Sequence, residues 1–256
     1  MILREALETA VRSMTEGRDV AVAFSGGLDS GTVAVLASRY AGSVRLYTVG
    51  TEDSYDVKAS KEMAEGLGLE WEHILLDEET LSDTVRESVR IAGTKDPVTL
   101  SFEVPLAVIL SHVKERYVIG GQGADELLCG YSKYLDLPEA ELKAAVERDM
   151  GTLDRVTLPH EKAVADRYGK EVLYPFLSGP VKESAAGLSY EELRPIGDDR
   201  KRPLRAVAEQ LNHPEIAAKP KKAAQYGSGS MNMMKRLSKA KGMSLSEWID
   251  SLSEGS

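Results

Sequence analysis

The sequence predicts an α/β protein with a doubly wound, mostly parallel sheet and a helical layer formed by its C-terminal half. Up to about residue 135, short apolar runs alternate with amphipathic stretches. Two of the apolar runs are followed directly by glycines, at 26–27 and 120–123. Strand patterns are scarce after residue 135. Strands that alternate with helices form parallel sheets with right-handed crossovers and helices on both faces.

The predicted elements follow one another at regular spacing. An amphipathic helix comes first, over residues 2–16, because its apolar residues recur at helical spacing. Strands are predicted over 19–24, 44–50, 71–76 and 116–121, and helices over 32–40, 54–68, 79–93 and 101–115. Later helices are predicted over 137–150, 159–169, 201–211 and 244–254. We expect residues 1–256 to form a single domain, with a β/α core over 1–135 and a helical part over 136–256 packed on the sheet.

Composition and charge narrow the classes of function. A net charge of −9 argues against a dedicated nucleic-acid binder, although seven basic and no acidic residues from Lys219 to Lys241 leave RNA open. No apolar run approaches the ~20 residues that span a bilayer, and the first helix lacks the apolar core of a secretory signal. The single cysteine, Cys129, excludes an internal disulfide. It fits a reducing cytosol, so we expect a cytoplasmic protein.

The stretch "SGGLDS" at 25–30 carries the strongest chemical signal. Gly26 and Gly27 can adopt backbone angles closed to other residues and let an anion approach the amides at the end of a parallel strand. Ser25 and Ser30 add hydroxyl donors. The Gly-Lys-Ser/Thr ending of a Walker A loop and the G-x-G-x-x-G spacing are both absent. Asp29 within an anion cradle indicates a metal ion that bridges carboxylate and phosphate.

This stretch resembles the pyrophosphate-binding loop of the N-type ATP pyrophosphatases, the PP-loop superfamily, whose fold is that of the adenine nucleotide alpha hydrolases. In that superfamily the loop holds the β- and γ-phosphates of ATP, an acceptor attacks the α-phosphorus, and pyrophosphate leaves. The resemblance implies that residues 1–135 form a nucleotide-binding core. It also implies that ATP, with Mg²⁺, binds at Ser25, Gly26, Gly27, Asp29 and Ser30.

A second stretch, "GGQGADELLCGYSKY" at 120–134, follows the fourth predicted strand. It resembles the asparagine synthetase segment Gly-Glu-Gly-Ser/Ala-Asp-Glu-Leu-Phe-Gly-Gly-Tyr. The resemblance places Gly121 and Gly123 in the cradle for ATP and substrate, and it implies that Asp125 holds Mg²⁺ together with Asp29. It gives catalytic positions to Gln122 and Glu126.

Three weaker stretches agree in order with the same family. Residues 46–74 resemble its second strand and place Val49 and Gly50 beside the adenine. Residues 169–181 resemble the segment Gly-Val-Glu-x-Arg-x-Pro-Phe-Leu-Asp. Residues 201–230 resemble the late Arg/Lys-Pro-Lys stretch and its glycine-rich loop, where Lys221 matches the lysine that neutralises charge on the α-phosphate. Lys222 is the competitor, because a shift of one residue exchanges the two.

The chain departs from the family pattern around the acceptor substrate and not in the ATP loop. Gln122 stands where the family has Glu, and a neutral amide cannot act as a general base. Leu173 stands in place of Arg, Ser178 in place of Asp, and Cys129 in place of Gly; two carboxylates, Asp154 and Glu161, lie near the place of another family carboxylate.

The resemblance implies an ATP-dependent amide synthetase, a carbon–nitrogen ligase that forms AMP and pyrophosphate. The enzyme would adenylate aspartate or a related small-molecule carboxylate, and ammonia or another amine would displace AMP. Family enzymes begin with a glutaminase domain, which we expect this chain to lack, so the nitrogen would come as free ammonia or from a separate glutaminase subunit. Two alternatives stay open: a PP-loop ATP pyrophosphatase that modifies tRNA or another acceptor, and a nucleotide-binding subunit without turnover. A homodimer also stays open.

Overall fold

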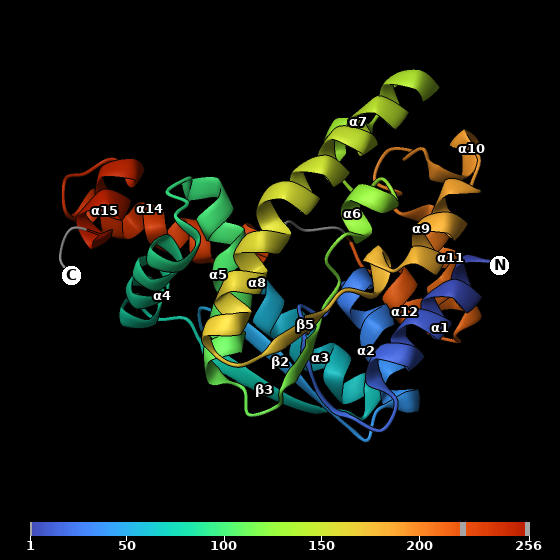
Figure 1. Cartoon of the computed structure of the whole chain (residues 1–256), viewed down its shortest axis with the longest axis horizontal. Coiled ribbons are helices and arrows are strands. Elements are labelled where there is room, and N and C mark those ends of the chain that lie inside the picture. Colours follow the sequence, from blue (N-terminus) through green and yellow to red (C-terminus); the bar gives the residue numbers. More distant parts are fainter. Residues whose placement is uncertain (1, 221–223, 254–256) are drawn as a thin grey trace.

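The computed structural model describes residues 2–220 and 224–253, the side chains of 224 and 225 excepted. The sheet has five parallel strands in the order β3-β2-β1-β4-β5 (Figure 1). The strands are β1 (Asp19–Ala23), β2 (Ser43–Gly50), β3 (Glu70–Leu75), β4 (Tyr117–Ile119) and β5 (Glu171–Leu173). From β1 the chain winds first towards β3 and later towards β5, which confirms the predicted doubly wound parallel sheet.

Helices cover both faces of the sheet. Val20 and Val22 of β1 point to one face and Ala21 points to the other. The first face is covered by α1 (Leu3–Thr15), α2 (Leu28–Tyr40), α3 (Tyr55–Leu67), α9 (Gly179–Ala186), α11 (Arg202–Gln210) and α12 (Pro214–Ala217). The second face is covered by α4 (Glu78–Ala92), α5 (Pro97–His112), α8 (Leu158–Arg167), α14 (Ser230–Ala240) and α15 (Leu245–Ser253). Burial on both faces explains why β1 is apolar at successive positions.

The C-terminal half is mainly helical, as predicted, and adds a strand that the sequence analysis did not predict. It contributes β5, which pairs in parallel with β4, and its helices pack on both faces of the sheet. The sequence analysis missed β5 because three residues are too few for a strand pattern. The remaining described helices are α6 (Ala124–Leu127), α7 (Glu139–Thr152), α10 (Tyr190–Leu193) and α13 (Ala224–Gly227), with 3-10 turns η1 (Ser132–Tyr134) and η3 (Pro175–Leu177). None of the helices in the described ranges combines the length and apolar character needed to cross a bilayer.

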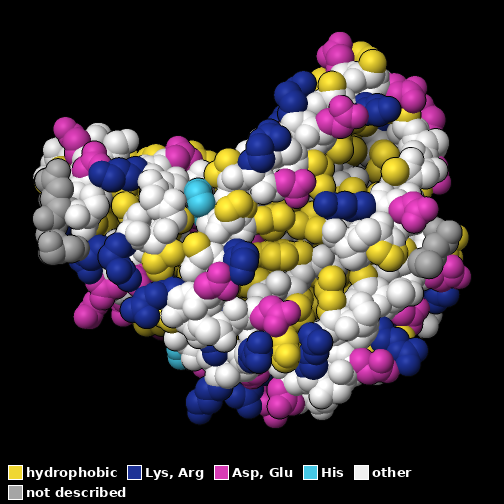
Figure 2. All heavy atoms as spheres, viewed as in Figure 1, with side chains coloured by type: hydrophobic (Ala, Val, Ile, Leu, Met, Phe, Trp, Pro, Cys, Tyr) yellow, Lys and Arg dark blue, Asp and Glu magenta, His cyan; other side chains and the backbone are white. Residues whose placement is uncertain are grey.

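α7 and α8 form one long helix that contains a π-helical turn, η2 (Leu153–Thr157). Pro159 lies just after this turn and has no N–H to donate, so the wider turn accommodates a residue that a regular helix interior would exclude. α7 projects from the body of the molecule, and the surface is indented between this projection and the side formed by α14 and α15 (Figures 1 and 2).

The start of α2 differs from the sequence prediction in a way that shapes the site. The helix begins at Leu28 instead of residue 32, so Asp29 and Ser30 lie in its first turn. The prediction followed apolar periodicity, which the polar first turn hides. Consequently the aspartate of "SGGLDS" is carried by the first turn of a helix.

Candidate active site

The two glycine-rich loops lie side by side at the point where the strand order reverses. Val22 near the end of β1 is paired with Ile119 at the end of β4. The loops 24–27 and 120–123 therefore leave the same edge of the sheet. In open parallel sheets, ligands bind outside the carboxyl ends of the strands at this switch point.

The first loop presents backbone amides at the amino end of α2. Ser25 N–H donates to Ser30 Oγ at 3.2 Å, and the two hydroxyl oxygens also lie 3.2 Å apart. Gly27 caps the helix without a side-chain hydrogen bond. Gly26 has φ +69°, and a Cβ at this position would lie 2.6 Å from Ser60 Cα on α3. The loop can therefore lie this close to α3 only with glycine at 26, and it leaves a helix amino end suited to an anion.

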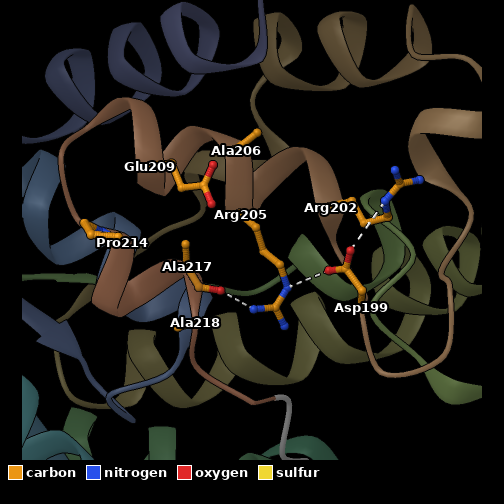
Figure 3. Close-up of a pocket in the computed structure, with 8 residues that line it drawn as sticks. All are labelled: Asp199, Arg202, Arg205, Ala206, Glu209, Pro214, Ala217 and Ala218. Carbon is orange, nitrogen blue, oxygen red and sulfur yellow. Dashed lines mark hydrogen bonds and ion pairs between the residues drawn. The ribbon is translucent and has the colours of Figure 1, made fainter.

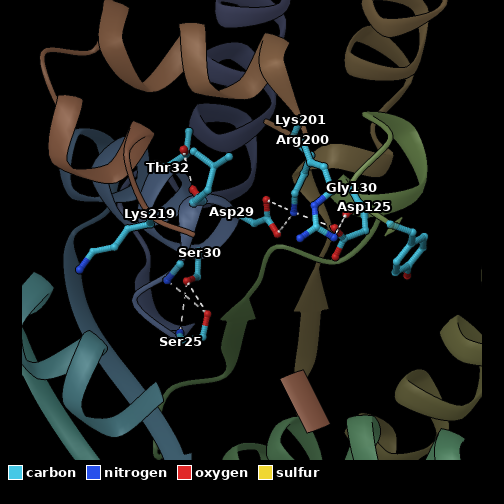
Figure 4. A network of polar contacts seen from close by, with 12 residues as sticks. Ser25, Asp29, Ser30, Thr32, Asp125, Gly130, Arg200, Lys201 and Lys219 are labelled. Carbon is cyan, nitrogen blue, oxygen red and sulfur yellow. Dashed lines mark hydrogen bonds and ion pairs between the residues drawn. The ribbon is translucent and has the colours of Figure 1, made fainter. Parts of the chain in front are cut away.

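Asp29 and Asp125 converge on one ammonium group (Figure 4). Lys201 Nζ lies 2.7 and 2.5 Å from the two carboxylate oxygens of Asp29, and 2.8 Å from Oδ1 of Asp125. Asp29 comes from α2, Asp125 from α6, and Lys201 from the residue just before α11. The structure thus brings together the two carboxylates assigned to one Mg²⁺, and their role as metal ligands stays a prediction.

Lys201 is a residue of the candidate site that the sequence analysis missed. Its side chain is 2% exposed. Burial alone would lower the pKa of its ammonium group, but the charges of Asp125 and Asp29 and their hydrogen bonds outweigh burial and raise the pKa. Lys201 was assigned only to the start of a helix, since nothing in the local sequence separates it from Arg200 and Arg202. Its partner Asp29 lies 172 positions earlier in the chain.

The residues present fit a magnesium ion. Mg²⁺ is usually bound by one or two carboxylates together with substrate phosphates and waters. Within residues 2–220 and 224–253, no group of three or more His, Cys, Asp or Glu side chains could hold a metal by itself. Asp29 and Asp125 already converge on one cationic centre, so they can supply the two carboxylates, and phosphate and water would complete the donor set.

Glycines next to the two aspartates make this convergence sterically feasible. A Cβ at position 121 would lie 2.6 Å from Asp29 Cβ, and one at position 130 would lie 1.9 Å from Asp125 Oδ1. Gly123 has φ +89° and lies against Leu177, where a Cβ would be 2.3 Å from Cδ2. Gly121 and Gly130 therefore clear space for the two carboxylates, which is a packing reason for glycine at these positions.

The turn before Lys201 is held by Arg205, which crosses a pocket of about 340 Å³ beside α11 and α12 (Figure 3). The Arg205 guanidinium donates to the carbonyls of Arg200 at 2.9 Å and Lys219 at 3.1 Å. It also pairs with Asp199 at 3.2 Å. Arg205 thus ties the turn that carries Lys201 to the segment after α12, where the late lysine stretch begins.

The end of β2 meets the late glycine-rich loop. Thr51 N–H donates to the carbonyl of Ser228 at 3.0 Å, and a Cβ at Gly50 would lie 3.2 Å from the same oxygen. The side chain of Val49 is buried in the core of the second face, so Val49 can offer only its backbone to a ligand. Lys221 and its competitor Lys222 lie outside the described residues.

Buried carboxyl groups surround the second loop on its other side. Gln122 Nε2 donates to Glu161 Oε1 at 3.1 Å, and Tyr174 Oη donates to Glu161 Oε2 at 2.7 Å. Burial raises the pKa of Glu161 to about 8. Glu126 accepts a hydrogen bond from the hydroxyl of Tyr131 at 2.6 Å, and burial raises the pKa of its carboxyl group as well. Glu161 is thus identified as the carboxylate bonded to the cradle, which sequence register alone left undecided.

The PP-loop class of ATP-binding proteins is defined by a doubly wound parallel sheet with a Ser-Gly-Gly-x-Asp-Ser loop at its switch point. A second loop, which carries a carboxylate, follows the neighbouring strand. Within that class, the family model named asparagine synthase matches residues 2–145. The chain belongs to the asparagine synthase family.

Three comparisons indicate how far this similarity extends. The protein named "Putative asparagine synthetase [glutamine-hydrolyzing] 1" of Methanocaldococcus jannaschii is 32% identical over 292 residues, covering 98% of this chain and 54% of that protein. Carboxyethyl-arginine beta-lactam-synthase of Streptomyces clavuligerus is 27% identical over 238 residues, covering 92% of this chain and 46% of that protein. The chain thus spans about half the length of these relatives. The structure of NMN synthetase from Francisella tularensis is similar at 14% identity and a TM-score of 0.47, over 98% of this chain and 90% of that one.

Proposed function

We propose that this chain catalyses an ATP-dependent amide synthesis that releases AMP and pyrophosphate. A small-molecule carboxylate, aspartate or a relative, attacks the α-phosphorus of ATP and forms an acyl-adenylate as pyrophosphate leaves. Ammonia or another amine then displaces AMP. The observation that carries this proposal is the convergence of Asp29 and Asp125 on one cationic centre beside the amino end of α2.

The terminal phosphates of ATP would lie on residues 25–30. The amides at the amino end of α2 favour negative charge, and Ser25 and Ser30 add hydroxyl groups within 3.2 Å of each other. Lys201 contributes a fixed positive charge, because its two carboxylate partners keep it ionised. Together these groups would bind and orient the departing pyrophosphate.

Mg²⁺ held by Asp29 and Asp125 would neutralise negative charge on the pyrophosphate as it departs. Val49 and Gly50 would border the adenine with their backbone, because the Val49 side chain is buried. Lys221 stays our choice for the lysine that faces the α-phosphate. Charge neutralisation and positioning of this kind typically contribute several kcal/mol to lowering a barrier.

The names of the relatives do not specify one acceptor acid or one nitrogen source for this chain. One relative is named as a glutamine-hydrolysing synthetase and another as a β-lactam synthase. The first name refers to asparagine and the second to carboxyethyl-arginine. We therefore propose a small-molecule carboxylate as acceptor, with ammonia supplied free or by a separate glutaminase chain.

Acid-dependent formation of AMP and pyrophosphate tests the function. Purified protein with ATP, Mg²⁺ and ammonium is screened against aspartate and related carboxylates, and both nucleotide products are measured. We expect at least one acid to stimulate equal amounts of AMP and pyrophosphate. Asp29→Asn should abolish this, whereas Asp19→Asn, at the opposite end of β1 and bonded to Ser43 Oγ at 2.6 Å, should not. Formation of ADP, or turnover that no acid stimulates, would contradict the proposal.

Two described residues of the basic stretch from Lys219 to Lys241 lie beside glutamates. Lys219 lies 3.9 Å from Glu62, and Arg236 lies 2.9 Å from Glu78. These pairs reduce the positive charge that Lys219 and Arg236 offer to a polyanion, and we propose amide synthesis as the function.

A further inference from the structure

The second half of the proposed reaction requires a proton acceptor, and the inference that follows rests on that proposed function. When the amine attacks the acyl-adenylate, its lone pair forms the new C–N bond. The bond from the acyl carbon to the phosphate oxygen of AMP breaks, and AMP leaves with that electron pair. The amine nitrogen must then lose a proton to a nearby base.

The side chain in the middle of the second loop cannot be this base. Gln122 stands between Gly121 and Gly123, and its neutral amide does not accept a proton at ordinary pH. Its amide nitrogen instead donates to Glu161 Oε1 at 3.1 Å. The loop is thus connected by one hydrogen bond to a carboxylate carried by α8.

The other carboxyl groups around the site have different partners. Asp29 and Asp125 are paired with Lys201. Glu126 accepts a hydrogen bond from Tyr131, and Glu103 lies 3.1 Å from Nδ1 of His160. Among the described residues, Glu161 is the buried glutamate that is hydrogen-bonded to Gln122, the side chain at the centre of the loop.

We infer that Glu161 accepts the proton of the attacking amine, and that Gln122 and Tyr174 are positioning residues that hold its two carboxylate oxygens. Tyr174 Oη donates to Oε2 at 2.7 Å, and Gln122 Nε2 donates to Oε1 at 3.1 Å. Two donors from separate segments, one just after β5 and one after β4, fix both oxygens. A carboxylate oxygen has a second lone pair, so Oε1 can bind Gln122 and still receive a proton.

The surroundings of Glu161 suit this task. Burial raises its pKa to about 8, the hydrogen bond from Tyr174 lowers the pKa, and the charges of Glu103 and Glu126 raise it. The titratable groups that face it are Glu103 from α5, Glu126 from α6 and Tyr174 from the turn after β5, with His160 beside it on α8. A base whose pKa lies near the working pH transfers protons most efficiently. Glu161 also lies one turn after the π-helical turn η2, a feature frequent at functional sites.

Measuring the two half-reactions separately distinguishes a loss of proton transfer from a loss of folding or of ATP binding. Acid-dependent exchange of labelled pyrophosphate into ATP reports adenylation, and amide formation reports the attack of the amine. We expect Glu161→Gln to keep the exchange rate within about threefold and to lower amide formation by about 10² to 10⁴. Glu141→Gln, the same change at an exposed glutamate of α7, should leave both rates unchanged.

The pH dependence of amide formation provides a second test with two opposite shifts. At a fixed concentration of the unprotonated amine, the wild-type rate should rise through about pH 8 to a plateau, because Glu161 accepts a proton only when ionised. Glu103→Gln removes a charge that raises the pKa of Glu161, so the midpoint should move to lower pH. Tyr174→Phe removes a hydrogen bond that lowers this pKa, so the midpoint should move to higher pH. Both variants should keep the pH rise, and Glu161→Gln should lose it.

The outcomes distinguish this inference from the proposed function. If no acid supports pyrophosphate exchange in the wild type, the proposed function is wrong and the inference falls with it. If exchange is normal and Glu161→Gln forms amide at the wild-type rate, or loses both half-reactions equally while folded, Glu161 is not the proton acceptor. If Glu161→Gln does not fold, the two midpoint shifts decide, and midpoints that stay at the wild-type pH overturn the inference.

Discussion

Replacing Lys201 by methionine tests the central contact of the site. At 2.7 Å and an effective dielectric constant of about 20, one ammonium–carboxylate pair is worth about 6 kcal/mol before desolvation. Removing one member of a buried pair typically costs about 3–5 kcal/mol, because the remaining charge stays buried without a partner. Here Asp29 and Asp125 would remain as two adjacent like charges. For a domain of this size we expect the Tm to fall by roughly 6–20 °C.

Thermal unfolding at neutral pH, with chelator present, measures this loss. Lys162→Met is the matched control, because Lys162 forms an exposed pair with Asp166 at 2.9 Å on α8. Such a surface pair contributes about 0–1 kcal/mol, so its loss should scarcely change the Tm. Added Mg²⁺ should raise the Tm of Lys201→Met more than that of the wild type, because the ion can then take both carboxylates without competition from the ammonium group.

Two results would refute this reasoning. A Lys201→Met protein as stable as the Lys162→Met control would mean that the two aspartates do not depend on a shared ammonium group. Equal stabilisation of wild type and variant by Mg²⁺ would mean that the ion binds somewhere other than between Asp29 and Asp125.

Three further outcomes are expected. Gly26→Ala should destabilise the fold by more than about 1 kcal/mol and abolish pyrophosphate exchange, because Gly26 has φ +69° and a Cβ there would lie 2.6 Å from Ser60. Gly17→Ala is the control: Gly17 has φ +71° with open space around it, so this variant should keep the exchange activity. Burial raises the pKa of Glu103 from its ordinary 4.5 to about 8, so the folded state binds more protons between those values and stability falls as pH rises from about 4.5 to 8. Glu103→Gln should flatten this decline by at least about 1.4 kcal/mol, the equivalent of one pKa unit, in urea unfolding at pH 5 and pH 8.5. Asp125→Asn should raise the Mg²⁺ concentration that half-saturates pyrophosphate exchange by about tenfold or more, and an unchanged Mg²⁺ dependence would remove this residue from the metal site.

Much of the candidate site could be predicted from local sequence. The alternation of apolar runs and amphipathic stretches predicted the parallel sheet, and strand-end glycines marked the loops 24–27 and 120–123. The resemblance to asparagine synthetases implied that the two aspartates that follow these loops lie together, and they meet at Lys201. Each of these signals lies within a few residues of the feature it predicts.

The contacts of Lys201 and Glu161, and the strand β5, could be recognised only in the tertiary structure. The sequence by itself determined the alternation of strands and helices and which residues stand at the ends of β1 and β4, because periodicity and glycine turns are local properties of the chain. Only the folded chain decided that the ammonium group of Lys201 lies between Asp29 and Asp125, and that Gln122 faces Glu161. A charged side chain is stable inside a protein only beside its partners, and these partners come from segments far apart in the sequence, so no local pattern can reveal them.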